Sequence, residues 1–261
     1  MLSQRYTGSH NSVVWQGYTV EDNSTYRSFM KNEVRERLND ESGKAEIESH
    51  LRGLASTGFD LDNINELLSA TPTEEKAWAI GEAFAEAILE KENSVEFPWN
   101  QKRDLRNENS SLSGADLIGL IDDNGQIKLL IGEVKTSQER AYPPQVMRGQ
   151  HGMIDQLKAY HINRTRQMTI VNWLLVRCKN TSFENKFNEA FKFFITNGNS
   201  GLYLVGVLVR ISVEANSMDF QNRGEALSEV LDGETKGHLQ AFYFPNTIND
   251  FVNLAIGGDQ C

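Results

Sequence analysis

The sequence predicts an α/β (α+β) fold in which helices flank a central mixed β-sheet. Apolar runs of strand length recur after residue 94, and helical segments lie between several of them. The runs are almost continuously apolar, which is typical of strands that are covered on both faces. We therefore expect a sheet buried between two layers of helices.

The first 70 residues are expected to form a mainly helical N-terminal region, and residues 71–261 the α/β domain. Apolar residues recur at helical spacing in YRSFMKNEVRERLND and AEIESHLRGLAST, and LDNINELLSATP ends at Pro72. A fourth helix is expected from Thr73, a suitable N-cap, through AWAIGEAFAEAILEKEN.

The later segments alternate between the two kinds of pattern. The expected strands are residues 95–98, 115–122, 126–137, 168–179, 201–214 and 238–246. The expected helices are residues 145–163, 182–198 and 247–258. The polar stretch at residues 101–114 is expected to be a loop.

Composition limits the classes of function. The net charge of −10 and the pI near 5.1 argue against a protein that coats DNA by bulk electrostatics, but permit an enzyme with a local basic groove. The two cysteines, Cys178 and Cys261, do not suggest a disulfide framework and fit a reducing cytoplasm. Neither a signal peptide nor an apolar run long enough to span a bilayer is evident, so we expect no membrane association.

The stretch LLIGEVKTS carries two charges in an otherwise apolar strand. Glu133 and Lys135 are two residues apart and would share one face. Burying such groups costs several kcal/mol (roughly 3–5 for a pair that loses one partner), so each needs a partner or a metal ion.

A hairpin brings a third charge to the same place. Asn124-Gly125 predicts a two-residue turn, and this turn sets Asp116 directly opposite Glu133. A three-residue loop would instead turn Asp116 to the other face. Two acids in opposition repel each other, and a divalent cation between them would remove the repulsion.

Asp116 in Gly114-Ala115-Asp116, followed by Glu133-Val134-Lys135, resembles the core motif of the PD-(D/E)xK nuclease superfamily, with GAD in place of the motif's proline and aspartate. Gln156-Leu157-Lys158-Ala159-Tyr160 is similar to the Q-hydrophobic-x-x-Y motif of the RecB-like branch. The resemblance covers roughly residues 75 to 180. It implies a restriction-endonuclease-like core.

The resemblance also implies a site and a chemistry. Family members often complete the metal site with a helical glutamate, for which Glu82 is favoured over Glu86 because Gly81 permits close approach to the sheet. Mg²⁺ or Mn²⁺ would be held by Glu82, Asp116, Glu133 and the Val134 carbonyl.

Other residues take supporting roles in this expectation. Lys135 would orient or deprotonate the attacking water, and Gln156 and Tyr160 would position the nucleophile or the DNA backbone. Arg148 and Lys158 are candidates for phosphate contacts. The five histidines show no zinc-ligand spacing.

The implied function is metal-dependent hydrolysis of DNA. The order of the helical region, the Gly81-Glu82 helix, GAD, E-V-K and a C-terminal aromatic strand is similar to the nuclease subunit of Hachiman-type bacterial anti-phage systems. That similarity implies a helicase partner with ATPase activity. Two alternatives remain open: a stand-alone restriction-type endonuclease acting as a homodimer, and a catalytically silent nuclease-fold interaction module.

Overall fold

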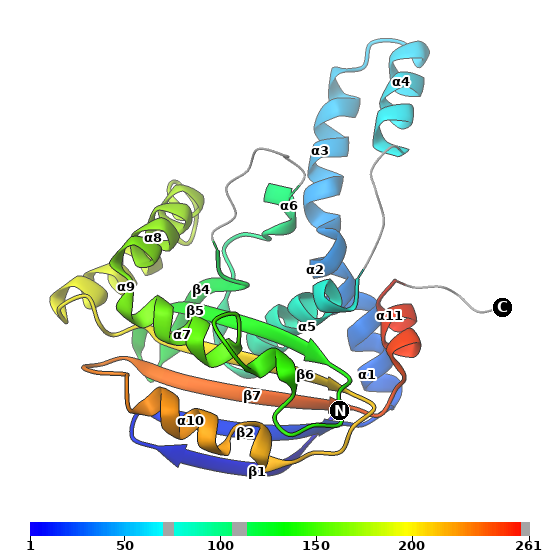
Figure 1. The fold of residues 1–261 in the computed structure, drawn as a ribbon. Coiled ribbons are helices and arrows are strands. Elements are labelled where there is room, and N and C mark those ends of the chain that lie inside the picture. The colour runs from blue at the N-terminus through cyan, green and yellow to red at the C-terminus, as the bar shows by residue number, and fades with distance from the viewer. Residues whose placement is uncertain (70–75, 106–113, 257–261) are drawn as a thin grey trace.

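A seven-stranded mixed sheet forms the centre of the computed structural model, which describes residues 1–69, 76–105 and 114–256 (Figure 1). The strand order in this described part is β1-β2-β7-β6-β5-β4-β3. The strands are β1 (Leu2–His10), β2 (Val13–Val20), β3 (Val95–Glu96), β4 (Leu117–Asp123), β5 (Gln126–Ser137), β6 (Tyr203–Ile211) and β7 (Lys236–Phe244).

The middle strands run parallel and the edge strands antiparallel. β2, β7, β6 and β5 are parallel neighbours, whereas β1, β4 and β3 pair antiparallel at the two edges. Crossovers between parallel strands place helices on the faces of the sheet, as the apolar strand sequences predict.

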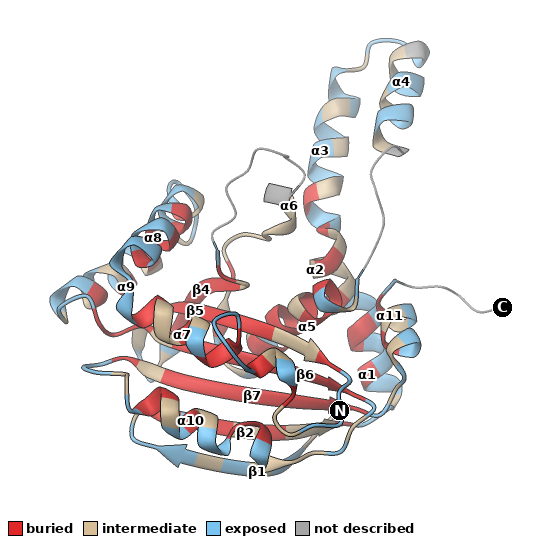
Figure 2. Ribbon diagram, viewed as in Figure 1, coloured by how far each residue is buried: buried red, intermediate tan, exposed pale blue. Residues whose placement is uncertain are grey.

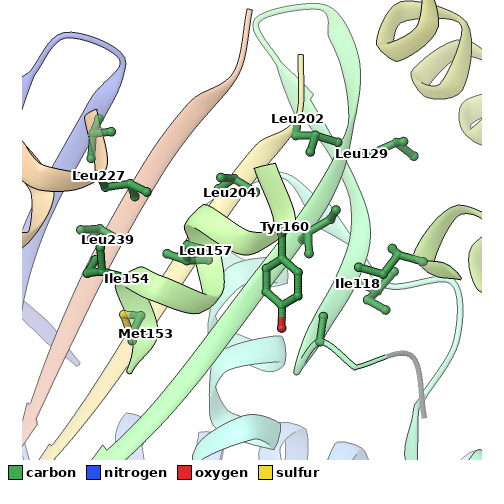
Figure 3. Close-up of a cluster of buried hydrophobic side chains, with 14 of the residues drawn as sticks. Ile118, Leu129, Met153, Ile154, Leu157, Tyr160, Leu202, Leu204, Leu227 and Leu239 are labelled. Atoms are coloured by element: carbon green, nitrogen blue, oxygen red, sulfur yellow. The ribbon is translucent and has the colours of Figure 1, made fainter. Parts of the chain in front are cut away.

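One face of the sheet is covered by α7, α8, α9 and α10. Their bounds are Met153–Ile162, Arg164–Cys178, Glu184–Thr196 and Gln221–Ser228. Met153, Ile154 and Leu157 of α7 pack over Leu204 and Leu239 of the sheet (Figure 3). This face also carries the odd-numbered side chains of β5.

The opposite face is covered by helices from both ends of the chain. They are α1 (Ser24–Phe29), the π-helical turn η1 (Met30–Val34), α2 (Arg35–Asn39), α5 (Ala77–Glu92) and α11 (Ile248–Ile256). Phe84 of α5 lies at the centre of this layer, with ring centroids 5.9 Å from Phe29, 5.2 Å from Phe242 and 4.9 Å from Phe244. The predicted burial of the sheet on both faces is confirmed (Figure 2).

A pair of helices, α3 (Glu41–Leu54) and α4 (Gly58–Ser69), projects from this body (Figure 1). Within the described side chains of the pair, Gly43 is the buried residue, and the outer turns are mostly exposed (Figure 2). We call these two helices the helical arm. Three short elements complete the described chain: the helix α6 (Lys102–Leu105) and the 3₁₀ turns η2 (Gln145–Met147) and η3 (Ser217–Asp219). No helix among the described residues is long and apolar enough to cross a membrane.

The first 20 residues form a β-hairpin that sequence analysis missed. β1 is an edge strand with no fully buried residue, so its sequence lacks a clear apolar alternation. β2 pairs with β7, and the one sheet therefore contains strands from both predicted regions. The helices expected between residues 26 and 69 are present.

The prediction of a strand at residues 168–179 is wrong, because this segment belongs to helix α8. Its buried residues recur at helical spacing, at Ile170, Val171, Leu174 and Cys178, while the intervening Leu175 and Val176 are exposed. The side chain of Asn163 caps the helix by accepting from two backbone N–H groups.

Other predicted bounds shifted at helix ends. The helix expected at residues 145–163 divides into η2 and α7, with Gly149 at a φ of +73° between them. The segment expected to be a loop contains the single turn α6, and its residues 106–113 lie outside the described part. Thr73 and the end of the last predicted helix also lie outside it.

Candidate functional site

The β4–β5 hairpin has the predicted register. Asn124 and Gly125 both have positive φ, 57° and 88°, as a two-residue hairpin turn requires. Leu117 pairs with Gly132 at the far end of the ladder, so the next position opposes Asp116 to Glu133. Both acids thus face the same side of the sheet, as the sequence predicts.

Asp116 is fixed to the backbone of β5. Its Oδ2 atom accepts a hydrogen bond of 2.8 Å from the Val134 N–H, just where the β4 ladder ends. The Val134 side chain packs into the opposite core, so only the backbone of Val134 faces the acids. Because the N–H and C=O of one strand residue point toward the same neighbouring strand, the Val134 carbonyl lies on the Asp116 side.

Glu133 has two partners that account for its burial. Lys135 Nζ lies 2.5 Å from Glu133 Oε1, and the Tyr160 hydroxyl lies 3.0 Å from Oε2. The same hydroxyl lies 2.7 Å from the Gly114 carbonyl oxygen. Figure 3 shows the Tyr160 ring among apolar side chains with its hydroxyl pointing out of them. Burial, together with the Glu133 charge, raises the pKa of Tyr160, which keeps the hydroxyl protonated as a donor.

Gly81 brings α5 close enough for Glu82 to approach these acids. A Cβ atom at Gly81 would meet Thr136 Oγ1 of β5, so any larger residue here would require a shift of Thr136 or of the helix. Glu82 then lies near Asp116, and Lys102 Nζ lies 3.8 Å from its Oε2 atom. Burial, followed by the charge of Asp116, raises the pKa of Glu82 to about 8.

Glu86 has a different environment from Glu82. It is buried and lies 3.8 Å from Nη1 of Arg37, which also pairs with Glu90. Burial raises the pKa of Glu86 to about 7, and the Arg37 charge opposes that rise. The pKa of Glu86 therefore responds to Arg37 and Glu90, whereas that of Glu82 responds to Asp116 and Glu133.

Asp116 and Glu133 lie close enough to affect each other's charge. Burial and the neighbouring Glu133 raise the pKa of Asp116, although the Val134 N–H and two lysines oppose the rise. Among the described residues, no three His, Cys, Asp or Glu side chains are arranged to hold a metal ion by themselves. Mg²⁺ does not need such a set, because it commonly uses one or two carboxylates and keeps several waters. The oxygen donors of Asp116 and Glu133 fit that mode of binding.

The remaining predicted site residues lie apart from the acids or make other contacts. Gln156 donates to the Gln150 carbonyl at 3.2 Å and accepts from Arg166 at 2.8 Å. Arg166 in turn lies over the Tyr160 ring, so Gln156 is linked to Tyr160 indirectly. Arg148 is exposed after η2, and Lys158 is half-buried on α7.

Sequence analysis missed three residues beside the acids. Gln101 Nε2 donates to the carbonyls of Ala115 and Asp116, at 3.3 and 3.1 Å, and so holds the start of β4. Lys102 and Trp78 line a cavity of about 280 Å³ together with Glu82 and Asp116. Spacing gave no signal for Gln101 or Lys102, since they belong to a segment expected to be a loop. The helical spacing of four between Trp78 and Glu82 could have identified Trp78.

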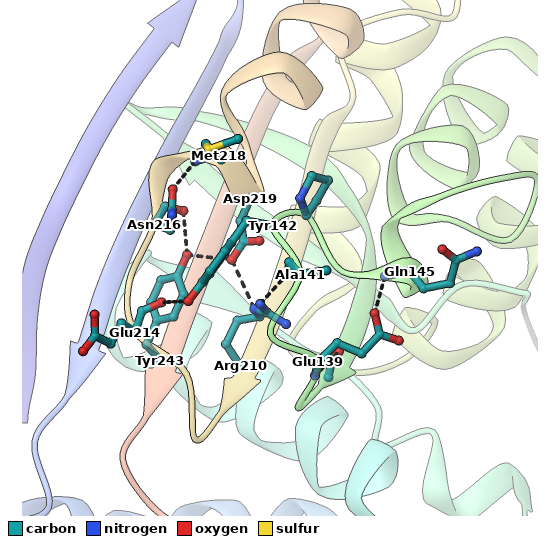
Figure 4. A network of polar contacts seen from close by, with 12 residues as sticks. Glu139, Ala141, Tyr142, Gln145, Arg210, Glu214, Asn216, Met218, Asp219 and Tyr243 are labelled. Carbon is teal, nitrogen blue, oxygen red and sulfur yellow. Dashed lines mark hydrogen bonds and ion pairs between the residues drawn. The ribbon is translucent and has the colours of Figure 1, made fainter.

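A buried ion pair lies farther along the same face of the sheet (Figure 4). Arg210, which pairs with Ser137 in the β5–β6 ladder, donates to Asp219 at 3.1 Å and to the Ala141 carbonyl at 2.9 Å. Asp219 also accepts from Tyr243 at 2.8 Å. Through Arg210, these contacts join Ala141, in the segment that leaves β5, to Asp219 of η3.

No protein-family model matches the sequence, and no curated protein matches it.

Proposed function

We propose that this protein is a metal-dependent DNA nuclease that hydrolyses phosphodiester bonds, built on a restriction-endonuclease-like core. The observation that carries the proposal is the meeting of Asp116, Glu133 and Lys135 at one point of the sheet, with the Tyr160 hydroxyl on Glu133. These residue types in this order resemble the PD-(D/E)xK motif and its RecB-like branch. The sheet order and the helices on both faces are compatible with such a core.

In this proposal each residue has a defined role. A Mg²⁺ or Mn²⁺ ion held by Asp116, Glu133 and the Val134 carbonyl would supply an acidified water and neutralise charge on the phosphate. Tyr160 donates to Glu133 and fixes the direction of its carboxylate. Lys135 leaves Glu133 to contact the scissile phosphate or the attacking water, to which its ammonium contributes positive charge.

Glu82 and the basic residues complete the proposal. Glu82 would add a carboxylate oxygen to this metal site, since it is the glutamate whose pKa responds to Asp116. Arg148 and Lys158 would contact phosphates farther along the DNA, and Gln156 would act through Arg166 on the Tyr160 helix.

The proposed biological role is that of the effector subunit of an anti-phage defence complex in the bacterial cytoplasm, acting with a helicase. It rests on the similarity of layout to Hachiman-type nuclease subunits. The competing restriction-type function requires a homodimer, and the catalytically silent module requires no cleavage at all. Plasmid cleavage separates the three: general degradation or nicking supports the defence nuclease, and a discrete fragment ladder supports the restriction enzyme.

The decisive experiment compares plasmid degradation by the wild type, Glu133→Ala and Lys135→Ala in Mg²⁺ or Mn²⁺, with and without the helicase partner. Lys186→Ala is a matched control, because Lys186 forms an exposed ion pair with Glu96 at the sheet edge. We expect the first two variants to lose cleavage by roughly a hundredfold or more, as for removal of one transition-state donor, and the control to retain it. Full metal-dependent cleavage by both site variants would rule out the proposed mechanism.

A further inference from the structure

Trp78 is the exposed aromatic side chain at the start of α5. Its exposed fraction is 52%, whereas the apolar side chains that follow it from Ala79 to Leu89 are buried. A half-exposed indole contributes little hydrophobic stabilisation to the fold, but it offers a large flat surface to a ligand. Trp78 precedes Glu82 by four residues, so the two side chains share one face of the helix.

Lys102 connects this ring to the acids. Its Nζ lies 5.3 Å from the centroid of the Trp78 ring and 3.8 Å from Oε2 of Glu82. A cation at that position can also accompany the phosphate of a nucleotide whose base lies on the ring. The ring, the cation and the acids therefore form a continuous row.

The row borders a single cavity. Trp78, Lys102, Glu82 and Asp116 all line it, and its volume is about 280 Å³. Pockets for small ligands begin at roughly 300 Å³, so this cavity is about as large as the smallest of them.

We propose that Trp78 stacks an unpaired base of the DNA beside the phosphate that is cleaved, which makes single-stranded DNA the substrate. This inference rests on the proposed nuclease function and specifies its substrate class. In the interior of a duplex both faces of every base are covered by neighbouring bases, so away from the duplex ends only an unpaired base can lie flat on Trp78. Stacking on an aromatic ring tolerates any base, and the site therefore selects strandedness without selecting sequence.

The test measures binding separately from cleavage. Fluorescence anisotropy in Ca²⁺ gives the affinity for labelled oligo-dT and for a blunt-ended duplex, comparing the wild type with Trp78→Ala and Trp78→Phe. We expect Trp78→Ala to weaken oligo-dT binding by about tenfold or more, as removal of one stacking platform does. Trp78→Phe keeps a ring and is expected to lose less than about threefold. Duplex binding is expected to be unchanged in both variants.

Two further measurements guard against a purely structural effect. Oligo-dT is expected to quench the fluorescence of Trp78 in the wild type, and this part of the quenching is expected to be lost in Trp78→Phe. Trp15 and Trp173 are buried and contribute little to it, and any quenching of the half-buried Trp99 remains in Trp78→Phe. Val176→Ala is the control for truncation of an exposed apolar side chain, since Val176 is 72% exposed on α8. It is expected to bind both DNAs as the wild type does.

The possible results separate this inference from the proposed function. Suppose that the wild type cleaves DNA. If Trp78→Ala then binds oligo-dT as well as the wild type does, or loses affinity for oligo-dT and duplex alike, the inference alone is overturned. A wild type that binds neither DNA in Ca²⁺ and cleaves neither in Mg²⁺ overturns the proposed function and the inference with it.

Discussion

At the scale of single residues, the charges of the candidate site are buried with identifiable partners. Glu133 contacts Lys135 and Tyr160, and Asp116 contacts the Val134 N–H. Buried polar groups cost little when they are hydrogen-bonded and cost roughly 1–3 kcal/mol when one partner is removed. The energetic importance of each contact can therefore be tested by deleting one atom.

Tyr160→Phe removes the hydroxyl that contacts Glu133 and the Gly114 carbonyl. We expect the free energy of unfolding to fall by about 1–2 kcal/mol, because the buried acceptors lose their donor. Urea unfolding measures the change. Tyr26→Phe is the matched control: Tyr26 is also fully buried, but its hydroxyl has no hydrogen-bond partner in the described structure. It is expected to be neutral or slightly stabilising, and equal losses in the two variants would contradict the assignment.

His238 predicts a dependence of stability on pH. Burial lowers its pKa to about 4, whereas the unfolded chain has a histidine pKa of about 6.5. Between these values the unfolded state binds a proton that the folded state does not. Stability is therefore full above about pH 6.5 and decreases as the pH falls, by at most about 1.4 kcal/mol per pH unit, until it levels off below about pH 4.

Urea unfolding of the wild type and His238→Gln at about pH 7 and about pH 5 isolates this contribution. Glutamine can still donate to Gln16, which accepts from His238 at 2.9 Å, but it does not titrate. We expect the variant to lose less stability than the wild type on acidification. An identical loss in both proteins would show that His238 does not cause it.

At the scale of elements, the position of α5 relative to β5 determines whether Glu82 reaches Asp116. Gly81 and Thr136 form a close contact between the two elements. Thr136 Oγ1 is buried and has no hydrogen-bond partner in the described structure, so it contributes bulk without a compensating bond. The position of α5 on the sheet therefore depends on the absence of a Cβ methyl group at Gly81.

Gly81→Ala is expected to destabilise the protein by about 1–3 kcal/mol, because the new Cβ overlaps Thr136 Oγ1. Adding Thr136→Ala removes that oxygen and is expected to restore most of the loss, so the two substitutions are non-additive. Gly53→Ala, on exposed α3 with nothing within 4 Å, is the control and is expected to stabilise by about 0.5–1 kcal/mol. Additive effects at residues 81 and 136 would contradict the proposed contact.

At the scale of the whole molecule, the N-terminal hairpin completes the sheet that carries the candidate site. β2 pairs with β7 over residues 13–19, and Val13 and Trp15 belong to the core under α10. The helical arm, in contrast, has mostly exposed outer turns. The two parts of the predicted N-terminal region thus differ in what they contribute to stability.

A chain that begins at residue 71 is expected not to fold, because it uncovers β7 and removes the helices that pack on Phe84. Size-exclusion chromatography and cooperative urea unfolding measure this outcome. The control replaces the outer part of the helical arm, residues 49–66, with a Gly-Ser linker and is expected to change stability by less than about 1 kcal/mol. A cooperatively folded, monomeric chain from residue 71 would show that the two predicted regions are separable.

The sequence predicted those parts of the fold that depend on local chemistry. The Asn124-Gly125 turn, the bounds of β5 and the opposition of Asp116 to Glu133 follow from turn preference and from a period of two. Gly81 was also correctly identified as a point of close approach to the sheet. Residues 168–179 were predicted to form a strand because the segment is rich in apolar residues. The helical period becomes visible only when the buried positions are known.

By itself, the sequence determined the hairpin and its facing charges, because turn type and strand alternation require only neighbouring residues. Both Glu82 and Glu86 lie on one face of the same helix, so their spacing alone could not distinguish them. Only the tertiary structure decided that Asp116 raises the pKa of Glu82 while Glu86 pairs with Arg37. It also brought Gln101, Lys102 and Trp78 to the acids, and closed the sheet with residues 2–20. Those contacts join segments that are distant in the chain. The distances between these segments depend on how the helices pack on the sheet, which no local pattern encodes.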